Sequence, residues 1–516
     1  MTTQKRSNLI ASLILLAFSL IQFAVVTKYM KSTYLYGKDT SWHLVNACLF
    51  SETLENWPGL FQAHRTLVSH RVTYPPLVYL VSVIPQWIAG DHGFRTILGT
   101  MAFFLFVLNL STYYLVRRLA DTKAAIWAVL FLAAAPGLLV QLAVFNLTLP
   151  LAAMTVLGLL ALEGTRSFLD RRGSILFGAV AGLAMITYIY FAFFLLVPVL
   201  YMAIRGVKES AHRSTALLNL ALASFVALLI SSPYFLGPQF SYWTRVTGYH
   251  LFGSPEVDAV AETVPTVPFF GIFWFYLKGI FDRLLGPALA VAACLGLVGL
   301  LLRRHPKALY LTLCLFGPLV LHSLLSNAYT ERLLPLAPVA CLTLAVAVST
   351  LERTGQRIIA SLLILALAAP FAWHRVTYDR NALENLPTLR FEDHIRILSE
   401  KIGDREAVIG TMYPKLLEYF SYRPEYSSLR LLEVHTAGTL DFYVRFANMD
   451  FLLVDFNFEK QFQNPEPIRR TLIHRWNWMA PRADRVLDDL LHIERTHDLL
   501  LRTENLGSGI SLYMRR

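Results

Sequence analysis

The sequence predicts a polytopic α-helical membrane protein with a small α/β domain at its carboxyl-terminal end. Of its 516 residues, 55% are hydrophobic and only 16% are charged, and the mean hydropathy is +0.49. Apolar stretches long enough to cross about 30 Å of hydrocarbon recur along the first three quarters of the chain. This composition excludes an ordinary soluble protein.

We predict eleven membrane spans from these stretches. The first is an uncleaved anchor, because no small-x-small cleavage pattern follows Val26. Residues 174–187 and 189–204 form one continuous apolar stretch, which is either a helical hairpin or one long tilted helix; its length favours the hairpin. The predicted spans are 8–28, 94–116, 123–142, 145–163, 174–187, 189–204, 215–235, 284–302, 308–325, 333–350 and 357–373.

The orientation follows from the basic residues, because cytoplasmic loops are enriched in Lys and Arg. With eleven spans, six basic clusters fall on one side, which places the amino terminus in the cytoplasm and the carboxyl terminus outside the inner (cytoplasmic) membrane. The net charge of +11 therefore reflects topology and not nucleic-acid binding. The clusters are Lys5/Arg6, Arg117/Arg118/Lys123, Arg166/Arg171/Arg172, Arg205/Lys208/Arg213, Arg303/Arg304/Lys307 and Arg353/Arg357.

Two outward loops belong to the membrane domain, which we assign to residues 1–373. The first loop, 29–93, contains two apolar stretches, 40–54 and 74–89, that are typical of helices lying at the membrane interface. The second loop, 236–283, ends in a run of aromatic residues suited to an interfacial belt.

Residues 374–516 have an ordinary composition and form the second predicted domain. Charged helical stretches alternate there with short apolar strands, which predicts a small α/β domain on the outer face. The helical stretches are 391–402, 413–421 and 468–492, and the strands include 407–410 and 451–454.

The segment 38–43 follows the first span and places a carboxylate and an imidazole at the membrane surface. If a helix begins near Thr40, Asp39 and His43 lie one turn apart and can meet one substrate. Asp39 is then a candidate base for chemistry, or it simply caps the helix. His43 adds a titrating group or a metal ligand, or is only hydrogen-bonded. The sequence identifies no cofactor, and the use of a divalent metal ion stays an open alternative.

Several short sequence elements follow one another along the membrane domain. They are Asp39 with Thr40 and His43, Tyr74-Pro75-Pro76-Leu77, Arg95, Gly182–Thr187, Pro233-Tyr234, and Arg332 with Pro335 and Pro338. In this order and placement the chain resembles the GT-C fold glycosyltransferases, in particular bacterial relatives of protein O-mannosyltransferases and of the aminoarabinose transferase that modifies lipid A. The chain departs from that pattern at a second acidic position, here Thr148, and at a lysine, here Tyr188.

The resemblance implies transfer of a sugar from a polyprenyl-phosphate donor to a hydroxyl of a lipid, glycan or protein, with inversion at the sugar. It implies Asp39 as the general base and Arg332 and Arg95 as cations for the departing phosphate. Arg332 could instead snorkel beside Glu331. The residues we assign to substrate binding are His43, His70, Arg71, Tyr74, Arg95, Tyr188, Arg245, Lys278, Glu331 and Arg332.

Three other functions stay open. A lipid-linked polysaccharide ligase or polymerase would also use a lipid-phosphate donor, but would not depend on Asp39. A lipid or sugar transporter would share the many spans, although the sequence has no internal repeat of the kind that transporters show. A catalytically inactive relative would explain Thr40 and Thr148.

Overall fold

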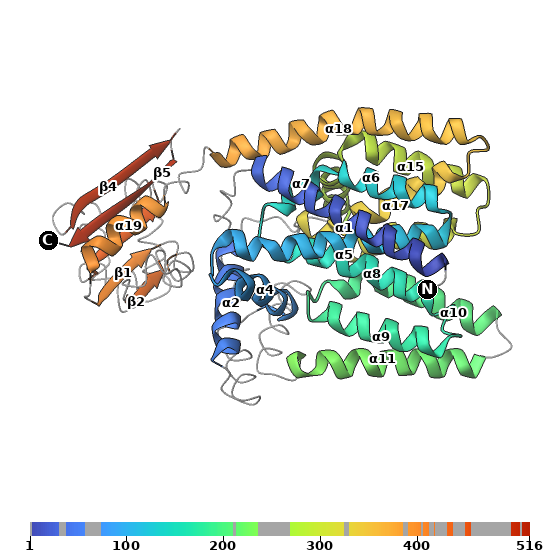
Figure 1. The fold of residues 1–516 in the computed structure, drawn as a ribbon, viewed down its shortest axis with the longest axis horizontal. Coiled ribbons are helices and arrows are strands. Elements are labelled where there is room, and N and C mark those ends of the chain that lie inside the picture. Colours follow the sequence, from blue (N-terminus) through green and yellow to red (C-terminus); the bar gives the residue numbers. More distant parts are fainter. Residues whose placement is uncertain are drawn as a thin grey trace. The chain divides into compact units, whose positions relative to one another are not determined.

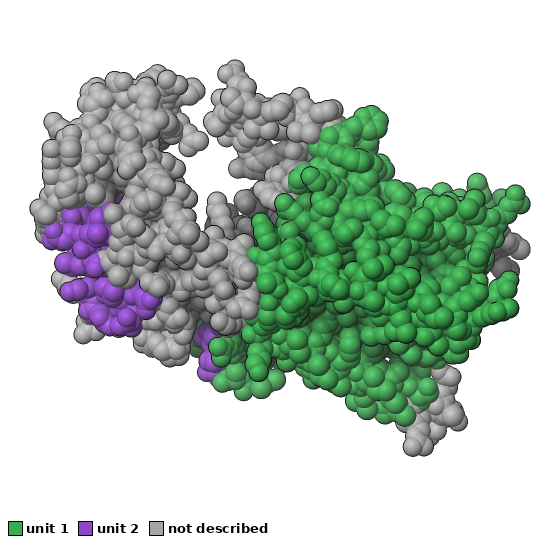
Figure 2. Space-filling view, turned by 90° about the horizontal axis from the view of Figure 1, so that it is seen from above, with its two compact units in different colours: residues 1–31, 49–89, 95–378 green, residues 32–48, 90–94, 379–516 purple. Residues whose placement is uncertain are grey.

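The computed structural model divides the chain into two compact units (Figures 1 and 2). Unit 1 contains residues 1–31, 49–89 and 95–378, and unit 2 contains residues 32–48, 90–94 and 379–516. Helices form unit 1, whereas the β-sheet lies in unit 2. The residues that the structure describes are 3–29, 38–56, 74–209, 213–235, 269–324, 330–384, 391–403, 406–411, 417, 431–436, 449–455, 497–505 and 508–515.

The helices of the chain follow its apolar stretches (Figure 1). An apolar segment in lipid must satisfy its own backbone hydrogen bonds, and a helix does this within one segment. Helices α2 (Lys38–Glu55) and α18 (Thr354–Glu384) each pass from one unit into the other. The remaining helices are α1 (Thr3–Tyr29), α4 (Leu77–Ala89), α5 (Phe94–Leu119), α6 (Thr122–Ala133), α7 (Pro136–Leu142), α8 (Thr148–Gly164), α9 (Arg171–Met185), α10 (Phe191–Glu209), α11 (Arg213–Phe235), α14 (Phe269–Gly279), the π-helical turn η1 (Ile280–Leu284), α15 (Gly286–Leu302), α16 (Ala308–Ser323), the 3₁₀ turn η2 (Thr330–Leu333) and α17 (Leu336–Ser349).

Every one of the eleven predicted spans overlaps a helix, but not every such helix is long enough to cross a membrane alone. Among the described residues, six helices have the length and composition of a span, or up to eight if two bent helix pairs each count as one. Helices α8, α9 and α16 have 17, 15 and 16 residues, fewer than the roughly 20 of a standard span. The count of eleven therefore stays a prediction.

Three breaks divide long apolar stretches into separate helices. The stretch 174–204 is a pair of helices, because α9 ends at Met185 and α10 begins only at Phe191; this is the predicted hairpin and not one long helix. The chain bends by 65° between α6 and α7, and by 117° between the continuous segment α14–η1 and α15. Gly286 allows the second bend, since its φ is +74° and a Cβ there would lie 2.5 Å from Cδ1 of Phe371.

Helices α9 and α11 pack closely through two glycines. A Cβ at Gly178 would lie 2.4 Å from the backbone oxygen of Ala223, and one at Gly182 would lie 2.8 Å from that of Ala227. Small residues let helix backbones approach in this way within a membrane. The close contact thus depends on the absence of side chains at these two positions.

Replacing Gly178 with alanine is expected to lower the melting temperature of the purified protein, because the new methyl group must push α11 away. Overpacking of this kind costs about 1–3 kcal/mol. The matched control is Gly299→Ala in α15, where a Cβ would meet nothing within 4 Å and where alanine should stabilise the helix by about 0.5–1 kcal/mol. Equal melting temperatures for the two variants would contradict the packing argument.

The turn between α8 and α9 is left-handed at three successive residues that are not glycine. Arg166, Ser167 and Phe168 have φ values of 52°, 60° and 64°. The Phe168 side chain is buried, its N–H donates to Oγ1 of Thr165 (3.2 Å), and its carbonyl accepts from Nδ2 of Asn219 in α11 (2.9 Å). Burial and these two hydrogen bonds hold a backbone conformation that such residues rarely adopt.

The carboxyl-terminal part of unit 2 has a five-stranded mixed sheet in the order β2-β1-β3-β5-β4. Strand β1 runs parallel to β2 and β3, whereas β5 is antiparallel to β3 and β4. The strands are β1 (Ala407–Thr411), β2 (Leu431–Thr436), β3 (Phe451–Asp455), β4 (His497–Asn505) and β5 (Ser508–Arg515).

Helix α19 (Phe391–Ile402) precedes the sheet and has one buried face. Ile395, Leu398 and Ile402 recur with helical spacing and are all buried. The predicted helix 391–402 and the strands 407–410 and 451–454 are therefore present. The predicted helices 413–421 and 468–492 lie outside the described residues, apart from residue 417, and the outer location of this domain stays a prediction.

Candidate functional site

Helix α2 carries the predicted catalytic segment. Because the helix begins at Lys38, Asp39 lies in its first turn and His43 lies one turn further along. Thr40, His43 and Ala47 are buried and share one face of the helix. The side chain of Asp39 is not among the described residues, so its role as a base stays a prediction.

The imidazole of His43 is buried, with 3% of the residue exposed. Burial lowers its pKa from the ordinary 6.5 to about 3, because an apolar environment disfavours the charged ring. His43 is then neutral at neutral pH. This disfavours the alternative in which His43 titrates during turnover, and leaves hydrogen bonding or metal ligation.

His43 should make the folded protein less stable in mild acid. Below about pH 6.5 the unfolded imidazole binds a proton while the folded one does not, so stability falls as the pH falls. Between about pH 6.5 and 5 this amounts to roughly 2 kcal/mol. We expect the melting temperature of His43→Gln to fall less than that of the wild type over this interval. The control is His374→Gln, at an exposed position; identical pH profiles for wild type and His43→Gln would contradict the assignment.

Three of the segments that carry the family resemblance come together in unit 1. Ile186 and Tyr234 form a buried pair, and Tyr74, Leu77 and Ile189 pack against it. The N–H of Leu77 donates to the carbonyl of Ile186 at 3.0 Å. The Tyr-Pro-Pro-Leu element, the Gly182–Thr187 run and the Pro233-Tyr234 pair are thus neighbours in the folded chain.

Arg332 lies against Tyr190, which belongs to the turn between α9 and α10. Its Nη1 donates to the hydroxyl of Tyr190 at 2.9 Å, and its Cζ lies 4.7 Å from the centre of the Tyr190 ring. The ring of Tyr188 makes an edge contact with Tyr190, at 5.0 Å between centroids. Two predicted binding residues, Arg332 and Tyr188, therefore both contact the side chain of Tyr190.

His322 completes this cluster and is fully buried. Its Nδ1 lies 2.9 Å from the carbonyl oxygen of Pro318, and its ring stacks on Tyr190 with 5.9 Å between centroids. Phe193 and Phe194 contact the same ring at 5.3 and 4.8 Å. The sequence marks His322 only as an ionisable residue near a membrane edge; its contact with Tyr190 depends on how α10 and α16 pack.

Three further charged residues that we assign to binding, Arg95, Lys278 and Glu331, are described by the structure and are exposed. Lys278 is the second-last residue of α14, and Arg95 is the second residue of α5. Glu331 lies 3.8 Å from Arg283, with 48% and 55% of the two side chains exposed. A pair this exposed adds little to stability, so Glu331 is available for a second interaction.

Thr148 belongs to a polar cluster that the sequence reasoning missed. Its Oγ1 lies within hydrogen-bond distance of two acceptors, Oε1 of Gln141 (2.9 Å) and Oδ1 of Asn146 (2.8 Å), and has one hydrogen to share between them. Asn146 Nδ2 also donates to Gln141. These three side chains lie where α7 ends and α8 begins. The signal in the sequence was a group of amides inside a long apolar stretch.

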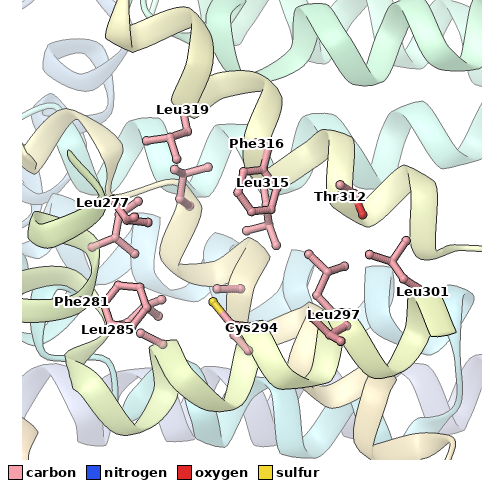
Figure 3. A pocket seen from close by; sticks show the side chains of 16 residues that line it. Leu277, Phe281, Leu285, Cys294, Leu297, Leu301, Thr312, Leu315, Phe316 and Leu319 are labelled. Atoms are coloured by element: carbon pink, nitrogen blue, oxygen red, sulfur yellow. The ribbon is translucent and has the colours of Figure 1, made fainter. Parts of the chain in front are cut away.

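An apolar groove lies among α14, η1, α15, α16 and α17 (Figure 3). It has a volume of about 260 Å³, and its lining is apolar except for Thr312 and the sulfur of Cys294. Figure 3 shows Leu277 and Leu319 near one end and Leu301 and Thr312 near the other. The residue after Leu277 is Lys278, and Leu319 precedes His322 by one turn of α16.

Some predicted contacts cannot be placed. His70, Arg71 and Arg245 lie outside the described residues. Within the described part of the chain, no group of three or more His, Cys, Asp or Glu side chains is arranged to hold a metal ion. The α2 residues up to Cys48 belong to unit 2 and the Arg332 cluster to unit 1, so their meeting in one site stays a prediction.

The fold is that of the GT-C membrane glycosyltransferases, as the resemblance predicted. It is similar to ArnT from Cupriavidus metallidurans bound to undecaprenyl phosphate, with 15% sequence identity, 97% of each chain covered and a TM-score of 0.62. The same protein in the apo state gives a TM-score of 0.58.

An archaeal structure is similar to a smaller degree. The oligosaccharyltransferase AglB from Archaeoglobus fulgidus, in complex with an inhibitory peptide and a dolichol-phosphate, has 12% identity and a TM-score of 0.51 over 97% of this chain and 74% of that one. No protein-family model matches the sequence, and no curated protein is similar to it in sequence. At these identities the likeness establishes the fold alone.

Proposed function

We propose that this chain is a membrane glycosyltransferase that moves a sugar from a polyprenyl-phosphate donor to an acceptor hydroxyl. The observation that carries the proposal is that Arg332 lies close in the chain to a residue that lines the apolar groove. Leu336, which lines the groove, begins α17 only four residues after Arg332. A polyprenyl phosphate has the same two parts, an apolar chain and an anionic head, and a guanidinium binds phosphate with two parallel hydrogen bonds.

The groove itself suits a hydrocarbon chain. Val298, Leu301 and Phe316 line it and keep 50%, 45% and 43% of their surface exposed, so the groove opens sideways to the surroundings of the helices. Lipid tails can enter such a groove directly from the bilayer. Lys278, next to the groove residue Leu277, offers a second cation near the end where the phosphate would lie.

The reaction needs a base and a stabilised leaving group. The acceptor oxygen forms a bond to C1 of the sugar while the bond from C1 to the phosphate oxygen breaks. Asp39 accepts the proton of the hydroxyl, and polyprenyl phosphate leaves with its negative charge held by Arg332 and Arg95. Attack from the face opposite the phosphate inverts the configuration at C1. Tyr74, Tyr188 and His43 contact the sugar or the acceptor in this proposal.

The distribution of basic loops supports an orientation with the amino terminus in the cytoplasm and the 374–516 domain outside. In this orientation α2 and Arg332 lie on the outer side of the cytoplasmic membrane. The acceptor is then a lipid, glycan or protein of the cell envelope.

The proposal is tested by transfer of radiolabelled sugar from a panel of polyprenyl-phosphate sugars to membrane extracts, with purified protein in detergent. In parallel, undecaprenyl phosphate should raise the melting temperature of the protein, because a ligand that binds only the folded state stabilises it. Undecanol of matched concentration is the control for detergent effects. If the protein shows no sugar transfer and no shift in melting temperature with undecaprenyl phosphate, the proposal is overturned. A shift in melting temperature without transfer would favour a transporter or an inactive relative.

A further inference from the structure

The side chains behind Arg332 form a continuous series from one helix to the next. Arg332 Nη1 donates to the Tyr190 hydroxyl (2.9 Å), Tyr190 stacks on His322 (30° between ring planes), and His322 Nδ1 lies 2.9 Å from the carbonyl of Pro318. Tyr190 is 5% exposed and His322 is 0% exposed. The series therefore runs from a half-buried guanidinium into the core of the helical unit.

The contact with Pro318 fixes the state of the imidazole. A carbonyl oxygen only accepts hydrogen bonds, so Nδ1 must carry the proton, and Nε2 of the neutral ring is then an acceptor. Within the described residues, Nε2 is buried without a hydrogen-bond partner. The enclosing rings of Phe193, Phe194 and Tyr276 leave the imidazole little freedom to rotate and find one.

Tyr190 is a neutral partner for a charged group. Its hydroxyl accepts one of the five N–H bonds of the guanidinium, and its ring lies under the same group at 4.7 Å. These two contacts restrict the guanidinium without cancelling its positive charge, because neither partner is an anion.

We propose that Tyr190 and His322 are positioning residues that hold Arg332 in the orientation in which it binds the phosphate of the donor. The inference rests on the proposed function for the identity of the ligand. It adds that the orientation of Arg332 is set by an aromatic stack anchored on Pro318. A fixed guanidinium loses less side-chain entropy when the phosphate binds, so disrupting the aromatic stack should weaken the affinity for the donor.

The first test needs no substrate. Arg332 is modified with phenylglyoxal and the modification is followed by mass spectrometry in wild type, Tyr190→Phe and His322→Leu. Loss of the hydroxyl or of the supporting ring should accelerate modification of Arg332 by about fivefold, corresponding to one ordinary hydrogen bond. His374→Leu, at an exposed position of α18, should have no effect. Tyr190→Phe keeps the aromatic ring, so this variant decides the test if His322→Leu folds poorly. Unchanged rates in both variants would overturn the positioning role.

The second test is a double-mutant cycle on the affinity for undecaprenyl phosphate. If His322 acts through Arg332, then His322→Leu should weaken binding in the wild-type background and have no further effect in Arg332→Ala. Losses that multiply in the double variant would show that His322 acts independently, and would overturn the proposal. If the wild type does not bind undecaprenyl phosphate, the proposed function fails, while the modification rates still decide whether Tyr190 and His322 position Arg332.

Discussion

Replacing Asp39 with asparagine is expected to reduce sugar transfer by about a thousandfold, within the range for removal of a general base. Asparagine has nearly the same shape but cannot accept the proton of the acceptor hydroxyl. The affinity for undecaprenyl phosphate should be unchanged, because the base acts on the acceptor and not on the phosphate. The measurement is the initial rate of transfer together with the melting temperature, which shows that the variant is folded.

Asp91→Asn is the matched control for this substitution. Asp91 lies in the same predicted outward loop, is exposed, and accepts a hydrogen bond from the N–H of Gly93 at 2.8 Å. Its amide variant should transfer sugar at the wild-type rate. An Asp39→Asn variant that is as active as Asp91→Asn would remove Asp39 from the mechanism and leave helix capping as its role.

Replacing Arg332 with glutamine should lower the rate of transfer by about 10²–10³-fold, the usual effect of removing one group that stabilises a developing anion. Unlike Asp39→Asn, this variant should also bind undecaprenyl phosphate more weakly. Arg332→Lys keeps the charge but cannot form the paired hydrogen bonds of a guanidinium. Its activity should therefore fall between that of the wild type and that of Arg332→Gln. The readouts are transfer rate and donor affinity.

Arg283→Gln separates this effect from a general loss of positive charge. Arg283 is an exposed arginine that pairs weakly with Glu331, the neighbour of Arg332 in the chain. Its removal should change transfer by less than about threefold, since exposed pairs are weak. Equal losses in Arg283→Gln and Arg332→Gln would mean that only the local charge matters, and would contradict a specific phosphate contact at Arg332.

The sequence was sufficient to predict a mostly helical membrane domain, because membrane helices are encoded by local composition. The break between α9 and α10 was also foreseeable, since the apolar stretch there is too long for one span. The span count is harder to obtain from sequence. Helix α8, for example, begins only at Thr148, after the polar cluster with Gln141 and Asn146 has ended the preceding helix.

The candidate site was only partly predictable. Tyr74, Ile186 and Tyr234 belong to three of the short elements on which the resemblance was based, but the order of these elements along the chain does not predict that they pack together. The stack of Tyr190 on His322 could not be predicted, because Tyr190, in the turn before α10, and His322, in α16, are far apart in sequence and neither occurs in a motif. Aromatic and imidazole side chains in apolar stretches are common, and only the packing of α10 against α16 shows which of them meet.

The left-handed turn at Arg166, Ser167 and Phe168 bears on the order in which the membrane domain assembles during synthesis. Three such residues cost roughly 3–6 kcal/mol relative to ordinary backbone, and one of the hydrogen bonds that stabilises them comes from Asn219 in α11. Helix α11 leaves the ribosome after both α8 and α9. The hydrogen bond from Asn219 to the carbonyl of Phe168 can therefore form only once α11 has entered the bilayer, and a chain arrested before Asn219 would lack this support of the turn between α8 and α9.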